Sequence, residues 1–156
     1  MRNKQKGFSL IELLIVVAII LIIAAIAIPN LLRSKMAANE ASAVGSLRSI
    51  NTACVTYSTT YGTGYPAALA NLGPAAAATA ATADLVDSVL AAGTKSGYVF
   101  TYVAGAPAAG VISTYTVAAN PVTLGTTGQR GFFTDQSGVI RADPTGPATV
   151  ASTPIG

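Results

Sequence analysis

One acidic residue lies at the start of the most apolar part of the sequence. Glu12 is followed by sixteen uninterrupted apolar residues, from Leu13 to Ile28. A carboxylate in a segment of this kind costs about 2.5–3.5 kcal/mol on membrane-insertion scales. An ionisable side chain there is a functional hypothesis that needs a partner, and the chemistry open to Glu12 is charge pairing with a cation.

A terminal amine at the start of the same segment is a candidate partner. If the chain were cut after Gly7, Phe8 would carry a free α-amine, and Glu12 would lie about one helical turn inside, near the positive end of the helix dipole. In a bundle of parallel helices, the amine of a neighbouring chain is equally available. Such a pair would neutralise two charges and fix the axial offset of two subunits, because buried ion pairs specify register better than they stabilise.

The segment that carries Glu12 is long enough to cross a membrane. From Phe8 it has 21 residues before Pro29, interrupted only by Ser9 and Glu12. A helix of that length measures about 31 Å, against about 30 Å for a bilayer core. Two simpler interpretations are a secretory signal peptide, with the sequence AIA at 25–27 as its cleavage site, and a membrane anchor that is never cut. Neither gives Glu12 a role.

Composition excludes several classes of site. The chain has 156 residues, of which 51% are hydrophobic and 10% charged, with no His, no Trp and a single Cys, Cys54. Catalysis by His, a Cys/His zinc cluster and an intrachain disulfide are therefore excluded. The net charge of +3 comes from Arg2, Lys4 and Lys6, and from residue 7 onward six cations face six anions. Since no basic stripe remains to bind phosphates, we expect no nucleic-acid binding.

The N-terminal residues resemble a known family. The sequence KGFSLIEL at residues 6–13, with Pro29 closing the apolar segment, resembles the start of type IV prepilins and type II secretion pseudopilins. The resemblance covers residues 6 to about 35. It makes an ordinary signal peptide much less favoured than a prepilin.

The resemblance implies a role for individual residues. Residues 1–7 would be a leader peptide that a membrane-embedded prepilin peptidase removes by cutting after Gly7. Phe8 would become the new N-terminus and be N-methylated. Glu12 would serve subunit alignment and assembly, and Pro29 is carried over as a second assembly position.

Beyond Pro29 the apolar pattern becomes one-sided, which predicts that the same helix continues to about residue 60. Residues 8–28 would form a transmembrane segment or filament core, and the rest of the 8–60 helix would pack a head. Proline lacks an N–H and clashes with the preceding turn, so we expect a kink or unwound turn there. The alternative is a boundary between two helices. The predicted buried stripe is Ala37, Ala41, Val44, Leu47, Ile50, Cys54, Tyr57 and Tyr61.

Cys54 falls on this stripe, where a cysteine is usually a small buried hydrophobe. Intermolecular disulfide pairing is the alternative, because the head would face an oxidising compartment. Many type IV pilins close a C-terminal loop with two cysteines, and this chain has only one.

We expect residues 61–156 to form a small globular head. Together with the long helix, this head gives a predicted fold class of α+β, with a pilin-like fold. Residues 62–97 are loop-like. Within them, residues 66–72 would form one short helix that Gly73 ends, and Asp84 would cap another that Gly93 stops. From residue 98 the apolar period falls to two, which predicts an antiparallel meander of three or four strands within 98–142, packed on the helix. The expected strands are 98–104, 111–119, 130–135 and 138–142.

The head offers little that could do chemistry. Gly125, Gly128 and Gly131 are evenly spaced, but no G-K-[ST] follows, which argues against a phosphate loop. Asp135 and Asp143 flank a tight turn; some pseudopilins hold calcium in this region, but two carboxylates are too few ligands, so turn stabilisation is favoured. We expect no catalytic residue, no metal site and no cofactor.

The sequence therefore predicts a prepilin that waits in the inner membrane as a single-pass protein and polymerises with identical subunits into an extracellular type IV pilus for adhesion, motility or DNA uptake. The alternative is a pseudopilin of a type II secretion system in a periplasmic pseudopilus. A binding module on an uncleaved anchor is a third possibility. Besides the peptidase and membrane lipid, the resemblance implies an inner-membrane assembly platform and a motor ATPase as partners.

Overall fold

The computed structural model describes residues 7–155 of the chain. Residues 1–6, which make up most of the predicted leader, lie outside the described residues. The chain divides into two compact units, Met1–Lys35 and Met36–Gly156. Each unit is described below by itself.

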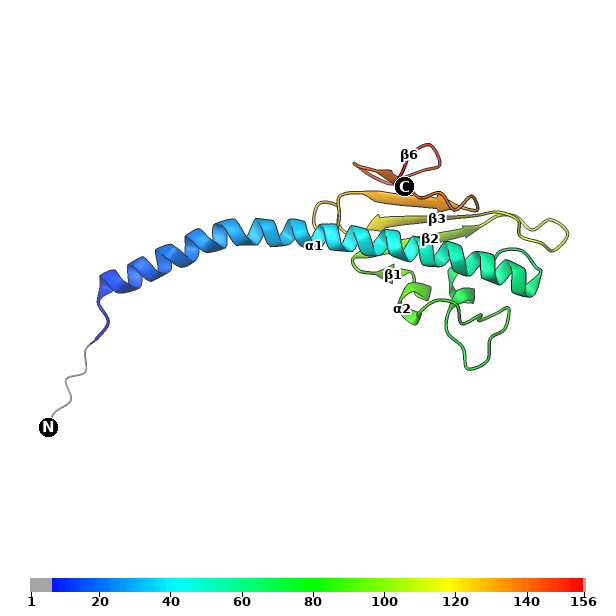
Figure 1. Ribbon diagram of the computed structural model, residues 1–156, viewed down its shortest axis with the longest axis horizontal. Coiled ribbons are helices and arrows are strands. Elements are labelled where there is room, and N and C mark those ends of the chain that lie inside the picture. Colours follow the sequence, from blue (N-terminus) through cyan, green and yellow to red (C-terminus); the bar gives the residue numbers. More distant parts are fainter. Residues whose placement is uncertain (1–6, 156) are drawn as a thin grey trace. The chain divides into compact units, whose positions relative to one another are not determined.

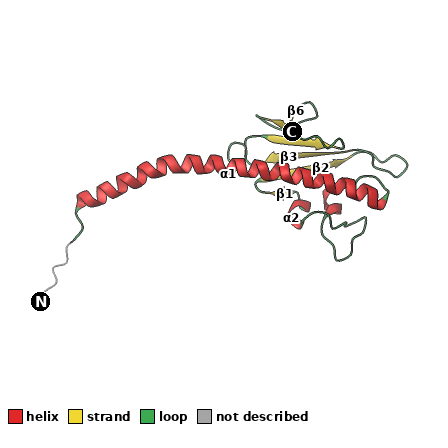
Figure 2. Ribbon diagram, viewed as in Figure 1, coloured by secondary structure: helices red, strands yellow, loops and turns green. Residues whose placement is uncertain are grey.

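A single α-helix, α1, runs from Leu10 to Tyr61 (Figures 1 and 2). Its helical residues continue through Pro29, so the alternative of two helices is wrong, and the unwound turn expected there is also absent from α1. A proline removes one helical hydrogen bond, and the strong helix formers on both sides carry the helix across it. A bend at Pro29 stays a prediction.

The second unit contains a six-stranded antiparallel sheet in which each strand pairs with the next along the chain (Figure 2). The meander is confirmed. It has six strands instead of the three or four expected; the additional strands β1 and β6 are two residues long and too short to show a period. The strands are β1 (Thr94–Lys95), β2 (Tyr98–Ala104), β3 (Tyr115–Pro121), β4 (Gly131–Asp135), β5 (Arg141–Asp143) and β6 (Thr153–Pro154).

Two of the predicted strands, 111–119 and 138–142, begin several residues before the corresponding strands β3 and β5 of the structure. Residues 111–114 precede β3, and Val111 and Ile112 form isolated bridges with Ala108 and Gly64 instead. Residues 138–140 precede β5, because the N–H of Gly138 closes a turn on the carbonyl of Asp135. In both places β-branched residues belong to loops. The alternation of apolar and polar residues does not distinguish such loop residues from the residues of a strand.

The core of the second unit lies between α1 and one face of the sheet. Along β2, Tyr98 and Phe100 are buried while Val99 and Thr101 are exposed, as a two-residue period requires. The predicted stripe is wrong at its start, because Ala37 and Ala41 are exposed. The buried residues of α1 are Glu40, Ala43, Ser46, Leu47, Ile50, Ala53, Cys54 and Tyr57.

A polar side chain also joins α1 to the sheet. Asn51 donates from Nδ2 to Oγ1 of Thr134 at 2.9 Å and accepts at Oδ1 from the hydroxyl of Tyr115 at 3.0 Å. Thr134 and Tyr115 are buried, so these bonds satisfy groups that burial would otherwise penalise. Asn51 thereby fixes the position of α1 across β3 and β4.

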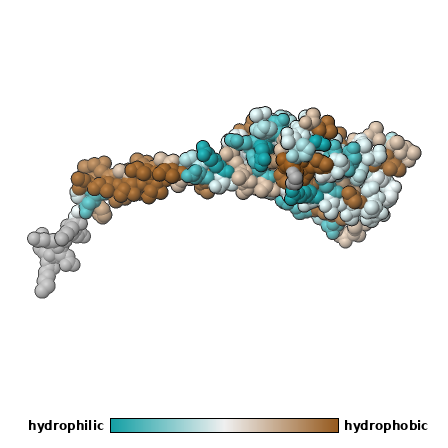
Figure 3. Space-filling view, turned by 45° about the horizontal axis from the view of Figure 1, so that its top comes forward, coloured by the Kyte–Doolittle hydropathy of each residue, from teal (hydrophilic) through white to brown (hydrophobic). Residues whose placement is uncertain are grey.

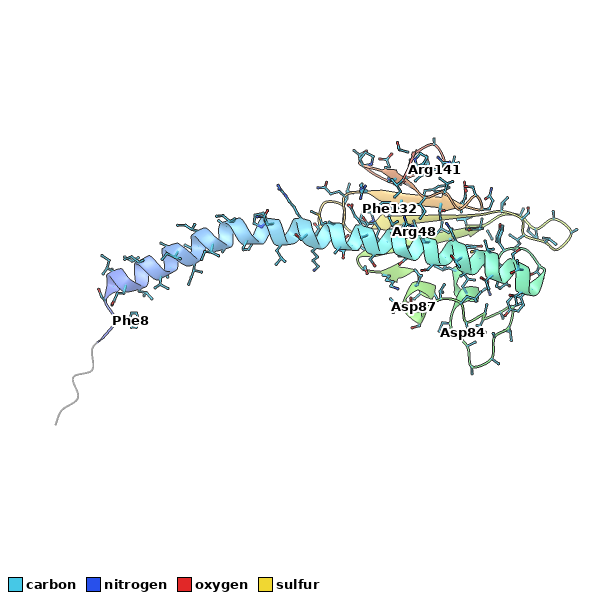
Figure 4. The ribbon with its side chains drawn as sticks, viewed as in Figure 1. Phe8, Arg48, Asp84, Asp87, Phe132 and Arg141 are labelled. Atoms are coloured by element: carbon cyan, nitrogen blue, oxygen red, sulfur yellow. The ribbon has the colours of Figure 1, made fainter. Side chains whose placement is uncertain are left out.

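Residues 62–93 contain a 3₁₀ turn, η1 (Leu69–Leu72), and a short helix, α2 (Ser88–Ala91). The predicted cap of the second helix is wrong by three residues. Asp87 caps α2 by accepting from the N–H of Leu90 at 2.9 Å, while Asp84 has a positive φ of 54° in the preceding loop (Figure 4). Gly93 follows the helix with a φ of 79°, as a residue ending a helix often does.

Candidate processing and assembly segment

The residues before α1 form a short non-helical stretch. Gly7, Phe8 and Ser9 precede the first helical residue, Leu10. Phe8 is 86% exposed, and its side chain is labelled at the start of the helix in Figure 4. A Cβ placed on Gly7 would meet nothing within 4 Å. The peptide bond between Gly7 and Phe8 therefore lies outside the helix, on an exposed part of the chain.

Glu12 closes the N-terminus of α1. Its Oε2 accepts a hydrogen bond from the backbone N–H of Ser9 at 2.9 Å. The carbonyl of Ser9 in turn accepts from the N–H of Leu13 at 3.2 Å, which makes Ser9 the N-cap. This is the acidic half of a capping box, in which the third helical residue bonds back to the cap. Sequence reasoning missed it, although the pattern Ser-x-x-Glu was there to find.

The capping bond leaves Glu12 able to pair with a cation. An ionised carboxylate can accept about four hydrogen bonds. Glu12 lies on the exposed surface of α1 and is the single charged residue between Gly7 and Leu32. A second group, such as an amine, can approach while the bond to Ser9 persists.

The apolar side chains around Glu12 are exposed and are not packed against other residues of their own unit. Large hydrophobic side chains from Phe8 to Leu32 are about half exposed or more, and Figure 3 shows them as a continuous apolar surface. By length and composition α1 can cross a membrane, a test that a signal sequence also passes. A helix that is apolar all round needs lipid or other helices around it. Pro29 belongs to this exposed surface, 17 residues after Glu12 or roughly 26 Å along the helix.

Cys54 is a buried core residue, as favoured from the sequence. It is 0% exposed, and burial raises the pKa of its thiol to about 12. The nucleophilic thiolate is therefore suppressed, and a disulfide to another chain would require the head to open.

The aspartates singled out in the head stabilise turns, and one of the singled-out glycines packs closely against a core residue. Asp135 accepts from the N–H of Ser137 at 2.9 Å, and Asp143 accepts from the N–H of Thr145 at 3.0 Å, so both stabilise turns. Gly128 packs on the ring of Tyr98. Within residues 7–155, no three His, Cys, Asp or Glu side chains cluster in a way that could hold a metal ion.

Comparison with known proteins finds matches to the N-terminal segment of the chain. The family described as "Prokaryotic N-terminal methylation motif" matches residues 2–28. The type IV wide pilus major component PilA4 of Thermus thermophilus is 65% identical over 40 residues, which are 26% of this chain and 30% of that protein. The type IV major pilin protein PilA of Myxococcus xanthus is 48% identical over 50 residues, 32% of this chain and 23% of that protein.

The type IV major fimbrial protein FimA of Dichelobacter nodosus is 48% identical over 58 residues, 35% of this chain and 37% of that protein. The chain thus spans between about a quarter and somewhat more than a third of the curated relatives it matches. No solved structure gives a significant match. Over residues 2–28 and matched stretches of 40 to 58 residues the chain is therefore similar to type IV pilins, and its long helix and antiparallel sheet form the α+β fold expected of such a protein.

Proposed function

We propose that this protein is a prepilin, a structural rather than catalytic subunit that is cleaved after Gly7, N-methylated at Phe8 and polymerised into a type IV pilus. The observation that carries the proposal is the arrangement at the start of α1. An exposed, non-helical Gly7–Phe8 bond lies just before α1, and the uncovered apolar part of that helix, residues 10–32, has a single acid, Glu12, one turn inside. Cleavage would create a cation beside that acid.

The geometry supports a mechanism of assembly in which apolar packing is kept throughout. Before assembly, lipid covers residues 8–28 in the inner membrane. During assembly the helix exchanges lipid for sister helices, so little apolar surface meets water. Glu12 of one subunit then pairs with the Phe8 amine of a neighbour and sets the axial stagger. Pro29, without an N–H, gives the helix one position at which it can bend to fit its neighbours.

The head units would tile the outside of the filament. Identical subunits that contact one another through two different surfaces, without closing a ring, build an open helix. We propose residues 1–7 as the leader, 8–60 as the helix and 61–156 as the head in this assembly. A prepilin peptidase, an assembly platform and a motor ATPase are the partners it would need.

A filament outside the cell is favoured over a pseudopilus. The three relatives described above carry names of major pilin or fimbrial components. The head, with few charges and many Ala and Thr residues, also suits display outside the cell. Adhesion, motility and DNA uptake are the roles such a filament would serve.

Protein recovered from sheared cells tests the proposal directly. We expect long filaments whose subunits begin with an N-methylated phenylalanine, read by N-terminal sequencing and mass spectrometry. The Gly7→Glu variant should accumulate in the membrane with its leader attached. Since a side chain at Gly7 meets nothing within 4 Å, misfolding would not explain that result. An intact leader on wild-type protein, or a start at Ile28, would rule the proposal out.

A further inference from the structure

The second unit buries one acidic side chain, at the point where α1 enters it. Glu40 is 9% exposed. Its Oε1 accepts from the backbone N–H groups of Gln129 at 2.9 Å and Arg130 at 3.3 Å, and its Oε2 accepts from Nε of Arg130 at 2.8 Å. Both oxygens are thus used, and all three donors belong to one segment.

That segment is the β3–β4 loop, residues 122–130, which keeps a shape of its own. The N–H of Gly125 bonds to the carbonyl of Gly128 at 2.8 Å, and the N–H of Thr127 bonds to the carbonyl of Thr123 at 3.0 Å. Internal bonds of this kind make a loop compact.

Two consecutive residues of α1 bind this loop. Asn39 donates from Nδ2 to the carbonyl of Thr127 at 2.8 Å, next to the contacts of Glu40. On the sheet side, the hydroxyl of Tyr98 donates to the carbonyl of Arg130 at 2.9 Å, and the Arg130 guanidinium lies 5.4 Å from the ring centre of Phe132. The loop is therefore held between the helix and the sheet by polar contacts.

The contacts of Asn39 and Glu40 lie at the margin of the apolar core, to which Tyr98 and Phe132 belong. The buried apolar residues of α1 begin at Ala43, and most of the β3–β4 loop is exposed, with Val122 and Leu124 more than half exposed. Strands β3 and β4 pair with each other along 116–119 and 132–135, which does not depend on Glu40. Loss of the Glu40 contacts would release the amides of Gln129 and Arg130 and loosen this end of the loop, while the pairing of β3 with β4 would remain.

We propose that Asn39 and Glu40 form a clasp that holds the β3–β4 loop on α1 and opens without unfolding of the sheet. Glu40 is its positioning residue, because it alone satisfies two backbone amides and the Arg130 side chain. One consequence rests on the proposed function. Tension passing along α1 in a filament would reach Asn39 and Glu40 before the apolar core, so the clasp would be the first part of the head to open.

Hydrogen exchange of the full chain in detergent micelles tests the clasp. In the Glu40→Ala variant, we expect the amides of Gln129 and Arg130 to exchange about ten- to hundredfold faster, since hydrogen bonds to a charged group are lost. The amides of Val117 and Phe132 should stay within about twofold of wild type. The Glu40→Gln variant should show a smaller rise, because its amide oxygen can still accept a bond. Asp143→Asn, which keeps a turn-forming side chain, is the matched control and should change neither set.

Two outcomes would overturn the clasp. Unchanged exchange at Gln129 and Arg130 in Glu40→Ala would mean that the carboxylate does not hold the loop. Equal acceleration at Val117 and Phe132 would mean that Glu40 stabilises the whole unit and nothing opens separately. If the alanine variant fails to fold, Glu40→Gln and Arg130→Gln supply the same comparison. Faster amide exchange confined to the loop in either variant supports the clasp. Neither readout depends on filament formation, so the clasp and the proposed function can fail separately.

Discussion

Glu12 and Ser9 are joined by a 2.9 Å hydrogen bond from the backbone N–H of Ser9 to the carboxylate of Glu12. This bond gives Glu12 a task inside its own chain, because it satisfies an N–H that the first turn of a helix leaves without a partner. The proposed pairing with a neighbour's amine is a second task for the same carboxylate. The two tasks differ in what they require: the cap needs an acceptor, and the pairing needs a charge.

Substitution of Glu12 by Gln and by Ala separates the two tasks. Glutamine keeps an acceptor for Ser9 and loses the charge, whereas alanine loses both. We expect both variants to be processed normally and neither to assemble efficiently, because the charge, rather than the cap, sets the stagger between subunits. Immunoblots of membranes and of sheared filaments measure processing and assembly. Wild-type filament yield from Glu12→Gln would show that the cap is sufficient and would remove the charge pair from the mechanism.

Much of the fold follows from periodicity alone. The change from an all-round apolar helix to a one-sided one, and then to a period of two, predicted α1 and the meander. The prediction of which side chains of α1 are buried was wrong at the start of the stripe, where Ala37 and Ala41 are exposed and Glu40 is buried. The predicted buried stripe does not include Glu40, an acid of a type that is seldom buried, and only the fold brings Gln129 and Arg130 to it.

The candidate site was predictable to a different degree. The position of Glu12 in the apolar segment indicates a partner. The helix begins at Leu10, two residues later than the predicted range 8–60, so Phe8 and Ser9 lie outside it. The bond between Glu12 and Ser9 was also readable as a capping box. By contrast, the cap of α2 was assigned to Asp84 instead of Asp87, because both precede the same apolar run and only backbone geometry distinguishes them.

Cys54 should resist thiol reagents in the folded chain. Its side chain is fully buried and its thiol pKa is raised to about 12, so little thiolate forms near neutral pH. We expect no labelling by a maleimide in native filaments at pH 7 and complete labelling after denaturation, measured by mass spectrometry. Filaments run on non-reducing gels should release monomers. Rapid native labelling or a disulfide-linked dimer would contradict the buried position.

Two glycines of the second unit should respond to alanine in opposite directions. Gly45 lies on the exposed face of α1 with nothing within 4 Å of an added Cβ, so Gly45→Ala should stabilise by about 0.5–1 kcal/mol. At Gly128 the added Cβ would overlap the hydroxyl of Tyr98 and lie 2.7 Å from Cζ of that buried ring. Gly128→Ala should therefore destabilise by about 1–3 kcal/mol. Chemical denaturation in detergent measures both, and shifts of the same sign would contradict the close packing at Gly128.

Glu40 should make the stability of the second unit depend on acidity. Burial alone would raise the pKa of this carboxyl, but hydrogen bonds from Gln129 and Arg130 and the charge of Arg130 outweigh it and hold the pKa below the ordinary value of 4.5. The folded state therefore binds this proton less tightly than the unfolded state does. The stabilisation is fully present above about pH 4.5 and is lost as the pH falls through the pKa of the folded state.

The Glu40→Gln variant should consequently lose less stability than wild type between about pH 5 and pH 3. Near-ultraviolet circular dichroism of tyrosine follows the second unit selectively, because all six tyrosines lie beyond Met36. Asp87 also has a lowered pKa, from hydrogen bonds with Lys95 and the N–H of Leu90, but it is exposed and its pairing with Lys95 is screened by solvent. Asp87→Asn should therefore keep most of the wild-type acid dependence. If Asp87→Asn reduced the pH dependence of stability more than Glu40→Gln does, the acid sensitivity would belong to the exposed Asp87–Lys95 pair and not to the buried carboxyl of Glu40.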